Sequence, residues 1–463
     1  MKIKLYDFKK YFNNSFWKAF KDKVLFYWQD DLPKIQRNII VENLYKDISN
    51  KNYYPSIPKT LIYTEKSEGV PRVIPVFEIK DYCLYYFCIK KLESRIAENR
   101  TPNTFWWWSL GGKIRQCEED EIDLLEDKIH EFEKDMANFY DVSVSEYSFN
   151  PRARSKSYWD FNWKLKSTIE TETYLFCVEF DIANFFDSIN LNLLEIYIRE
   201  IWNKEDSEVI SILFHFLQYR NRKNNHYNKS TVWIPQDALW DCSRILANYY
   251  LQKYDNYIYE QCWSDFKYFR YADDQFIFWN DLEKLKEKIF KAWIYLNKLW
   301  LSINQKKVIY WKVEELLEYR SFELFDIVSW DNVSIDNIDE FTSKVVSLYK
   351  RNWHDELKNK WLSLLNKSIL LNLNNISIWN KSYLKWLFID DDYLKQARPY
   401  QFWKIYDILS DQEKIDFIVL LHRIADNYKY NQYHYSVLQF FENRKIDKSD
   451  IIKKISNLEN FYD

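Results

Sequence analysis

Three aspartates follow or interrupt apolar stretches of the chain. Asp181 comes directly after "YLFCVEF" (174–180), a continuous run of β-forming residues that is typical of a strand buried on both faces. Asp273 and Asp274 stand inside "YFRYADDQFIFW" (268–279), which predicts a strand, a turn and a second strand. Because ionised carboxylates are costly to bury without a partner, acids at the ends of buried strands indicate a cation site. The alternative is a solvated turn, since turns favour Asp.

Strands lying side by side would bring Asp181 against Asp273 and let the two acids share a pair of Mg²⁺ ions. Two such ions, about 3.5–4 Å apart, activate an attacking hydroxyl and stabilise the leaving oxygen during in-line phosphoryl transfer. If the two strands are neighbours, the acids therefore predict metal-assisted transfer of a nucleotide to a 3′-hydroxyl.

Helices and strands alternate around these acids. The alternation over 174–325 indicates an α+β core domain, and the tail beyond it indicates a separate helical domain. Asp281 stands where it would cap a helix. Apolar residues recur with helical spacing at about 79–96, 118–140, 191–219, 241–260 and 282–299, and again from about 335 to the end.

The composition is that of a globular chain. Charged residues make up 29% and hydrophobic residues 47% of the 463 residues, which is enough for two or three domains with full cores. The chain shows neither a signal-peptide core nor an apolar run of about 18 residues, so we expect a cytoplasmic protein with no membrane partner. The six cysteines lack a CxxC pair and zinc-like spacing, and we expect them to be buried thiols.

Six stretches resemble, in the right order, the motifs of reverse transcriptases. "FDIANFFDSI" and "YADD" are similar to the motifs that carry the catalytic acids, and "WIPQDALWDCSRILANYYL" lies between them where the nucleotide-side motif belongs. "LWLSINQKK" follows them, while "GVPRVIPVFEIKDYCLYYFCIKKLE" and "TFWWWSLGGK" precede them as the fingers motifs do. The resemblance covers about residues 55–325, and the order of the motifs makes it far more specific than any one of them.

The resemblance implies roles for the acids and their neighbours. Asp181 and Asp273 match the metal-binding pair, Asp274 matches the supporting carboxylate, and the backbone carbonyl of Ile182 commonly completes the metal site in this family. Phe186 falls on the steric-gate position, where a ring would collide with a ribose 2′-hydroxyl and so favour dNTPs. Core packing is the alternative for Phe186, because Phe185 beside it is also apolar.

Further residues match positions that handle the nucleotide. Gln236 would line the template side of the site, and Arg72 would grip the incoming triphosphate with its guanidinium, with Lys66 as a second candidate. Lys307 matches the lysine that can protonate the leaving pyrophosphate, although Lys306 is adjacent. A solvated surface position is the alternative for each lysine.

Two basic stretches interleave cations with aromatic residues. Phosphates bind the cations and exposed bases stack on the rings, so both stretches are candidates for binding nucleic acid, with a solvated loop as the alternative. With a net charge of −3, the chain must gather such residues on one face. The cations singled out are Arg152, Arg154, Lys156, Arg220 and Arg222.

Tryptophan stands at several motif positions where the family has glycine. Trp233 precedes "IPQ", Trp279 follows the second strand of the acid hairpin, and Trp300 lies in "LWLSIN". The chain has only 3 Gly against 21 Trp, while average usage would give about 7% Gly. One hypothesis explains both numbers, namely that UGA codons read as glycine by the source were translated as Trp. The alternative is a chain that evolved to be rich in Trp. The family's Gly after "IPQ" is Asp237 here, a departure at the motif that handles the template.

The resemblance implies an α+β fold with a right-hand polymerase core of fingers and palm, an antiparallel palm sheet, and an α-helical C-terminal domain. The expected divisions are a helical extension (1–55), fingers with an insertion (56–170), a palm with the carboxylates (171–325) and a thumb-like or accessory helical domain (326–463).

The implied activity is RNA-directed or template-independent DNA synthesis. The implied cofactors are two Mg²⁺ ions, with Mn²⁺ as an alternative ion. The implied partners are dNTPs and an RNA or DNA template-primer, and a non-coding RNA is one candidate for that template. Lacking a zinc-finger, nuclease or retron signature, the chain is most like the bacterial "unknown group" and abortive-infection reverse transcriptases of antiviral defence. A mobile-element or retron reverse transcriptase and a catalytically silent RNA-binding scaffold remain as alternatives, and the oligomeric state stays open.

Overall fold

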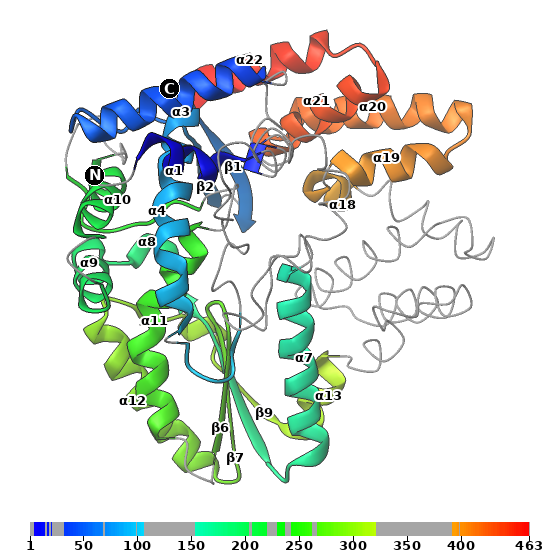
Figure 1. Cartoon of the computed structure of the whole chain (residues 1–463). Helices are drawn as coiled ribbons and strands as arrows, with labels where there is room; N and C mark the ends of the chain where they lie inside the picture. The colour runs from blue at the N-terminus through cyan, green and yellow to red at the C-terminus, as the bar shows by residue number, and fades with distance from the viewer. Residues whose placement is uncertain are drawn as a thin grey trace, which may run out of the picture. The chain divides into compact units, whose positions relative to one another are not determined.

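The computed structural model divides into two compact units (Figure 1). The first unit comprises residues 1–61 and 74–319, and the second comprises 62–73 and 320–463. No helix in the described residues is both long and apolar enough to cross a membrane. The structure describes residues 4–13, 16–17, 20, 32–67, 70–98, 100–105, 153–202, 206–219, 229–236, 242–261, 266–320, 391–397 and 399–462.

A five-stranded sheet forms the centre of the first unit. Its strands are, in spatial order, β3 (Thr104–Phe105), β6 (Phe266–Tyr271), β7 (Asp274–Trp279), β4 (Phe176–Phe180) and β9 (Ile309–Lys312). The strands predicted at 174–180 and across 268–279 are confirmed, and they pair directly with each other. The expected antiparallel sheet needs one correction, because the short β3 pairs with β6 in parallel, with Thr104 opposite Arg270.

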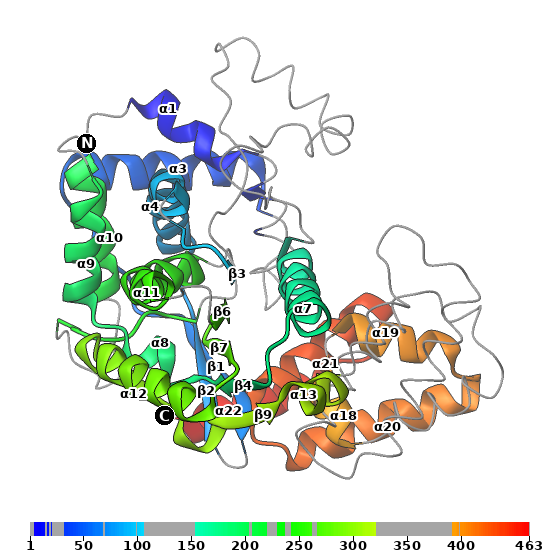
Figure 2. The same cartoon turned by 90° about the horizontal axis from the view of Figure 1, so that it is seen from below.

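Helices cover the sheet on both faces. Figures 1 and 2 show α7 on one side of β6 and β7, and α11 and α12 on the other side. Local sequence explains α12, because the Asp281 side chain accepts hydrogen bonds from the backbone N–H groups of Glu283 and Lys284, as predicted for a cap. The main helices of this unit are α4 (Ile79–Glu98), α7 (Ala153–Thr171), α9 (Leu191–Glu200), α10 (Ser207–Tyr219), α11 (Cys242–Glu260) and α12 (Leu282–Lys298).

The remaining elements of the first unit lie before, between and after these helices and strands. Aromatic packing joins the N-terminal helices to α4, with the Phe8 and Phe87 ring centroids 4.8 Å apart. The cysteines in the described residues (Cys83, Cys88, Cys177 and Cys242) are buried and free, as expected, while Cys117 and Cys262 lie outside the described residues. These elements are α1 (Leu5–Lys9), η1 (Lys10–Phe12), the longer helix α3 (Lys34–Ser49), β5 (Ile182–Ala183), α8 (Phe185–Ser188), β8 (Ser302–Ile303), η5 (Gln305–Lys307) and α13 (Val313–Arg320).

The second unit combines C-terminal helices with a short distant segment. Asn431 accepts a hydrogen bond from the backbone N–H of Tyr63 at 2.7 Å, and the Tyr428 hydroxyl donates to Glu65 at 2.5 Å. The predicted helical tail is confirmed over 391–462, while 321–390 lies outside the described residues. The helices of this unit are α18 (Asp391–Gln396), α19 (Pro399–Ile408), α20 (Asp411–Asn427), α21 (Asn431–Arg444) and α22 (Ser449–Tyr462). Its strands are β1 (Thr60–Ser67) and β2 (Val70–Val76), of which residues 60–61 and 74–76 are grouped with the first unit.

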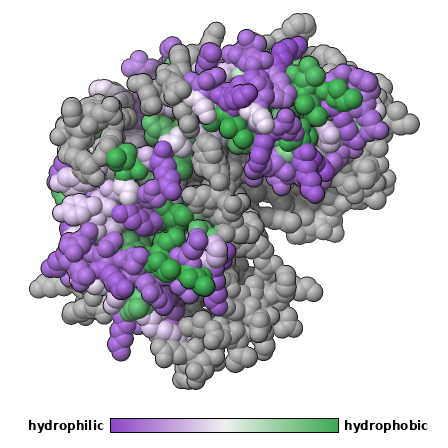
Figure 3. Space-filling view, turned by 90° about the horizontal axis from the view of Figure 1, so that it is seen from above, coloured by the Kyte–Doolittle hydropathy of each residue, from purple (hydrophilic) through white to green (hydrophobic). Residues whose placement is uncertain are grey.

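Some apolar side chains stay at the surface. Figure 3 shows hydrophobic residues in small groups among hydrophilic ones on one face of the molecule. Large exposed side chains include those of Ile35, Phe290, Trp300 and Val419. Single exposed apolar residues of this kind are normal in soluble proteins and do not by themselves mark a site.

Candidate active site

The end of β4 and the turn between β6 and β7 bring the predicted acids to the same end of the sheet. Phe180 pairs with Gln275, so one further step of the same antiparallel register places Asp181 opposite Asp274. Asp273 precedes Asp274 in the turn. The Asp181 residue is only 6% exposed, whereas Asp273 is half-buried and Asp274 is exposed. The side-by-side strands that the carboxylate prediction required are therefore present, with Asp274 rather than Asp273 in the position opposite Asp181.

The two oxygens of the Asp181 carboxylate differ in their contacts. Oδ2 accepts a hydrogen bond from Nζ of Lys307 at 2.6 Å. Oδ1 is buried and has no hydrogen-bond partner among the described residues. The backbone is also fixed, because the Asp181 carbonyl accepts from the N–H of Asn304 at 2.9 Å. A buried carboxylate oxygen without a donor is costly, which favours a cation as the ligand of Oδ1.

Lys307 stands in the field of all three acids. Burial alone would lower the pKa of its amine, but the hydrogen bond and charge of Asp181, with the charges of Asp274 and Asp273, raise that pKa above its ordinary value. The ammonium form is therefore favoured beside Asp181. The structure also separates the adjacent pair of lysines, since it is Lys307 that contacts Asp181.

A divalent ion fits the donor set. Mg²⁺ prefers oxygen ligands, and the free Oδ1 of Asp181 supplies a hard, buried, anionic one. Asp273 and the Ile182 carbonyl are the further ligands that the sequence predicted. Within the described residues, however, no three His, Cys, Asp or Glu side chains are already gathered closely enough to hold a metal ion. The amine of Lys307 neutralises Asp181 in this arrangement.

The predicted gate residue lies next to the predicted nucleotide-side motif. Phe186 is half-buried, and its ring centroid is 5.7 Å from that of the buried Phe185. Its backbone carbonyl accepts from the N–H of Ile234 at 3.1 Å, and Trp233 donates to Ile189 at 3.0 Å. The segment that ends in the half-buried Gln236 therefore runs beside the residues that follow Asp181. Residues 237–241, with the divergent Asp237, lie outside the described residues.

The structure does not test the remaining predicted binding residues at this site. Arg72 is exposed on β2 and Lys66 lies near the end of β1, both in the second unit, so their contact with a triphosphate stays a prediction. Arg154 and Lys156 fall on α7, but their side chains are not described. Arg152, Arg220 and Arg222 lie outside the described residues.

The backbone at the suspect tryptophans gives a mixed result. Trp233 and Trp300 have φ values of 83° and 62°, which is the left-handed region. Trp279 is not among the residues with positive φ; it ends β7, where its ring stacks on Phe266 at 5.3 Å. The structure therefore gives a backbone reason for glycine at 233 and 300, and none at 279.

Sequence reasoning missed a buried polar network behind the acids. Arg270 on β6 is fully buried and contacts Asp255 and Asn248 of α11. The available signal was a charged residue inside the apolar run "YFRYA", which is unusual for a buried strand unless the charge is paired.

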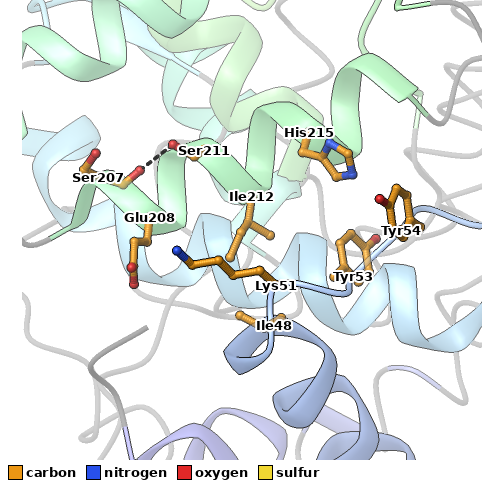
Figure 4. Close-up of a pocket in the computed structure, with 9 residues that line it drawn as sticks. All are labelled: Ile48, Lys51, Tyr53, Tyr54, Ser207, Glu208, Ser211, Ile212 and His215. Carbon is orange, nitrogen blue, oxygen red and sulfur yellow. Dashed lines mark hydrogen bonds between the residues drawn. The ribbon is translucent and has the colours of Figure 1, made fainter.

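A cavity of about 370 Å³ lies between the loop after α3 and helix α10 (Figure 4). The rings of Tyr53, Tyr54 and His215 gather at one end of it, and burial lowers the pKa of His215. No predicted site residue lines the cavity. The residues that line it are Ile48, Lys51, Tyr53, Tyr54, Ser207, Glu208, Ser211, Ile212 and His215.

One known family matches the part of the chain that holds the predicted acids. Residues 123–324 match the family described as "Reverse transcriptase (RNA-dependent DNA polymerase)". This stretch contains Asp181, Asp273, Asp274 and Lys307, and the match supports a reverse transcriptase as the enzyme class. A search of curated proteins returned no match.

Solved structures of telomerase show a distant likeness. Telomerase from Candida tropicalis with a fragment of telomeric RNA is 11% identical with a TM-score of 0.33, covering 91% of this chain and 68% of that one. The apo telomerase from Candida tropicalis is 12% identical with a TM-score of 0.32, covering 92% and 74%. Telomerase from Candida albicans, also with telomeric RNA, is 10% identical with a TM-score of 0.32, covering 92% and 68%.

Proposed function

We propose that the chain extends a 3′-hydroxyl or a protein hydroxyl with dNTPs by two-metal nucleotidyl transfer, with an RNA template or none, in antiviral defence. The observation that supports the chemistry best is the buried carboxylate of Asp181, which has one oxygen held by Lys307 and the other without a donor among the described residues. It lies at the end of the sheet where the turn presents Asp273 and Asp274. The family match over 123–324 supports the RNA-directed DNA polymerase class.

The chain's own residues have separate tasks in this proposal. Asp181, Asp273 and the Ile182 carbonyl would hold divalent ions, which when bound would supply activation of the attacking hydroxyl and stabilisation of the leaving oxygen. Lys307 keeps a proton at Nζ next to Asp181, in reach of a departing pyrophosphate. Phe186 excludes a 2′-hydroxyl, Gln236 lines the template side, and Arg72 binds the triphosphate.

Incorporation of nucleotides tests the chemistry. The purified full chain is supplied with each dNTP and Mg²⁺, and the product and any bound nucleic acid are sequenced. Asp273→Asn should abolish incorporation, whereas Glu283→Gln, at a side chain 80% exposed on α12, should leave it unchanged. Synthesis that survives Asp273→Asn would refute the assigned site, and a folded chain that incorporates nothing would favour the RNA-binding scaffold.

Phage challenge tests the biological setting. The proposal of defence rests on the resemblance to the "unknown group" and abortive-infection reverse transcriptases. Bacteria that express the chain with its neighbouring genes should plate phage less efficiently, and Asp273→Asn should restore plating while Glu283→Gln should not. Equal plating for the active chain and Asp273→Asn would argue for a mobile-element or retron role.

A further inference from the structure

Arg270 connects the turn that carries the acids to helix α11. Its Nε and Nη2 donate to the two oxygens of Asp255 at 2.8 and 2.5 Å, a bidentate pair. Its Nη1 donates to Oδ1 of Asn248 at 2.7 Å and to the backbone carbonyl of Ala272 at 2.8 Å. Arg270, Asp255 and Asn248 are each 0% exposed, so no water competes for these bonds.

The bond to Ala272 reaches the peptide that leads into Asp273. Ala272 has φ 58°, a left-handed conformation that a residue with a Cβ adopts at a cost and that suits the first position of a tight hairpin turn. The carbonyl of Ala272 and the N–H of Asp273 belong to one planar peptide unit. A guanidinium that holds this carbonyl therefore fixes the orientation of the Ala272–Asp273 peptide plane, and with it the backbone N–H of Asp273.

Core filling alone does not account for the network. A buried ion pair is often no more stabilising than apolar residues of similar volume, because both charges lose their hydration. The pair is joined here by Asn248 and by the Tyr268 hydroxyl, which donates to Asp255 at 2.8 Å. The contact that apolar residues could not replace is the one to the turn.

We infer that Arg270 is a positioning residue, which holds the Ala272–Asp273 peptide against α11 so that Asp273 and Asp274 are preorganised for divalent ions. This inference rests on the proposed function, since it assigns these acids to the ions of that site. The network keeps the turn in place without contacting the ions or the substrate itself.

Binding of Mn²⁺ alone tests the inference without requiring turnover. Arg270→Lys keeps a charge beside Asp255, but one ammonium group cannot also hold Asn248 and the Ala272 carbonyl in the same planar geometry. We expect the full-length variant to bind Mn²⁺ at least tenfold more weakly in calorimetry. Its apparent Mg²⁺ requirement for dNTP incorporation should rise in parallel, with a much smaller loss of rate at saturating Mg²⁺.

The control is Tyr249→Phe, which removes a buried hydrogen bond from an α11 hydroxyl to the Tyr197 carbonyl (3.0 Å), involves no residue of the acid hairpin, and should keep wild-type Mn²⁺ affinity. A folded Arg270→Lys variant with unchanged affinity would overturn the inference. If that variant does not fold, Asn248→Ala decides, with a loss of about threefold expected and no loss overturning it. A wild-type chain that binds Mn²⁺ but incorporates no dNTP would defeat the proposed function and leave the positioning role intact.

A separate observation concerns Trp300, which stands where a helix ends. The Leu301 N–H donates to the carbonyl of Leu296 at 2.9 Å, and the Trp300 N–H donates to that of Asn297 at 3.0 Å. This is the Schellman pattern after α12, and it places Trp300 at the left-handed position that glycine normally occupies. The Trp300 side chain is 71% exposed, so packing does not explain its presence.

Trp233 also has a positive φ, 83°, and a bulky residue with positive φ is an outlier. The chain has 3 Gly and 21 Trp in 463 residues. We propose that residues 233 and 300 are glycine in the native protein and are encoded by UGA. The positive-φ position at 233 and the helix stop at 300 then carry no Cβ.

The gene and the native protein test this second proposal. We expect UGA codons at 233 and 300, UGG codons at Trp159 and Trp163, and a glycine mass in native peptides that contain residues 233 and 300. Trp300→Gly should also raise the midpoint of thermal unfolding relative to the Trp form. A UGG codon at either position, or a tryptophan mass in the native peptide, would overturn the proposal.

Discussion

The two carboxylate oxygens of Asp181 have different hydrogen-bond partners. Oδ2 accepts from Lys307, while Oδ1 is buried without a donor among the described residues. The side chain of Lys307 is 60% exposed, so its amine can leave at little cost when a stronger cation arrives. The lysine therefore acts as a removable counter-ion for Asp181, in addition to its proposed role as proton donor.

Replacing this lysine should separate binding from catalysis. In Lys307→Met no amine competes for Asp181, so Mn²⁺ affinity should stay the same or rise up to roughly fivefold, the range of a weak ion pair. Incorporation of dNTPs should nevertheless fall by about 10²-fold, because the proton donor is lost. Calorimetry and single-nucleotide incorporation measure the two effects. Lys306→Met is the matched control and should change neither, and equal loss of binding and rate would contradict this division of roles.

The ring of Phe186 should determine whether the site accepts ribonucleotides or deoxyribonucleotides. The ring is half-buried and borders the segment of Ile234, which suits a wall that a ribose 2′-hydroxyl would strike. Phe186→Val should raise the efficiency of rNTP use relative to dNTP use by at least tenfold, about 1.4 kcal/mol. Competitive incorporation of matched rNTP and dNTP pairs measures it. Phe185→Val, at the fully buried neighbour, should lower stability without changing sugar preference; if it alone alters that preference, the gate is misassigned.

The first turn of helix α4 contains a buried acid, Asp81. Asp81 is 0% exposed; it accepts from the Tyr53 hydroxyl at 2.7 Å and from the Ser56 N–H at 3.0 Å. Burial raises its pKa to about 6, although both hydrogen bonds act in the opposite direction. Because the folded-state pKa lies above the unfolded one, the stabilising contribution is present below about pH 4. It is lost as pH rises through about 6.

Asp81→Asn should remove this pH dependence. The shift corresponds to roughly 3 kcal/mol as an order of magnitude. The free energy of unfolding of the variant, relative to wild type, should therefore rise by that amount between pH 4 and pH 7. Any constant cost of placing an amide next to Ser56 cancels in this slope. Urea unfolding at several pH values measures it, with Glu78→Gln as a control acid nearby. Parallel pH profiles for wild type and Asp81→Asn would rule out the assignment.

Local sequence patterns predict the helices and strands better than they predict the contacts between distant segments. The strands at β4, β6 and β7 and the cap of α12 follow from runs and spacing within a few residues. The parallel pairing of β3 and the grouping of 62–73 with the C-terminal helices depend on distant segments, which no local pattern encodes. The same holds for the site: the acids were predictable from strand ends, whereas the Asp181–Lys307 contact spans 126 residues and was accessible only through the family resemblance.

For the whole molecule, charge balance restricts how nucleic acid can bind. The chain has 66 Lys and Arg against 69 Asp and Glu, so overall attraction to phosphate is absent and any attraction must be local. The basic stretches predicted from the sequence, around 152–156 and 220–223, are the candidates for that local attraction.

The salt dependence of RNA binding tests whether the basic stretch at 220–223 contacts nucleic acid. Each phosphate contact to single-stranded nucleic acid contributes about −0.7 to the slope of log affinity against log salt concentration. The double variant Arg220→Gln/Arg222→Gln should therefore make the slope for single-stranded RNA shallower by about 1.4, with Mg²⁺ held constant. The matched control is Arg423→Gln/Arg444→Gln, which removes two arginines paired with Asp391 and Asp407 in the second unit. Because those charges are already neutralised, the control should leave the slope unchanged. A slope that responds equally to both double variants would mean that binding follows overall charge, and the stretch at 220–223 would then not be a nucleic-acid contact.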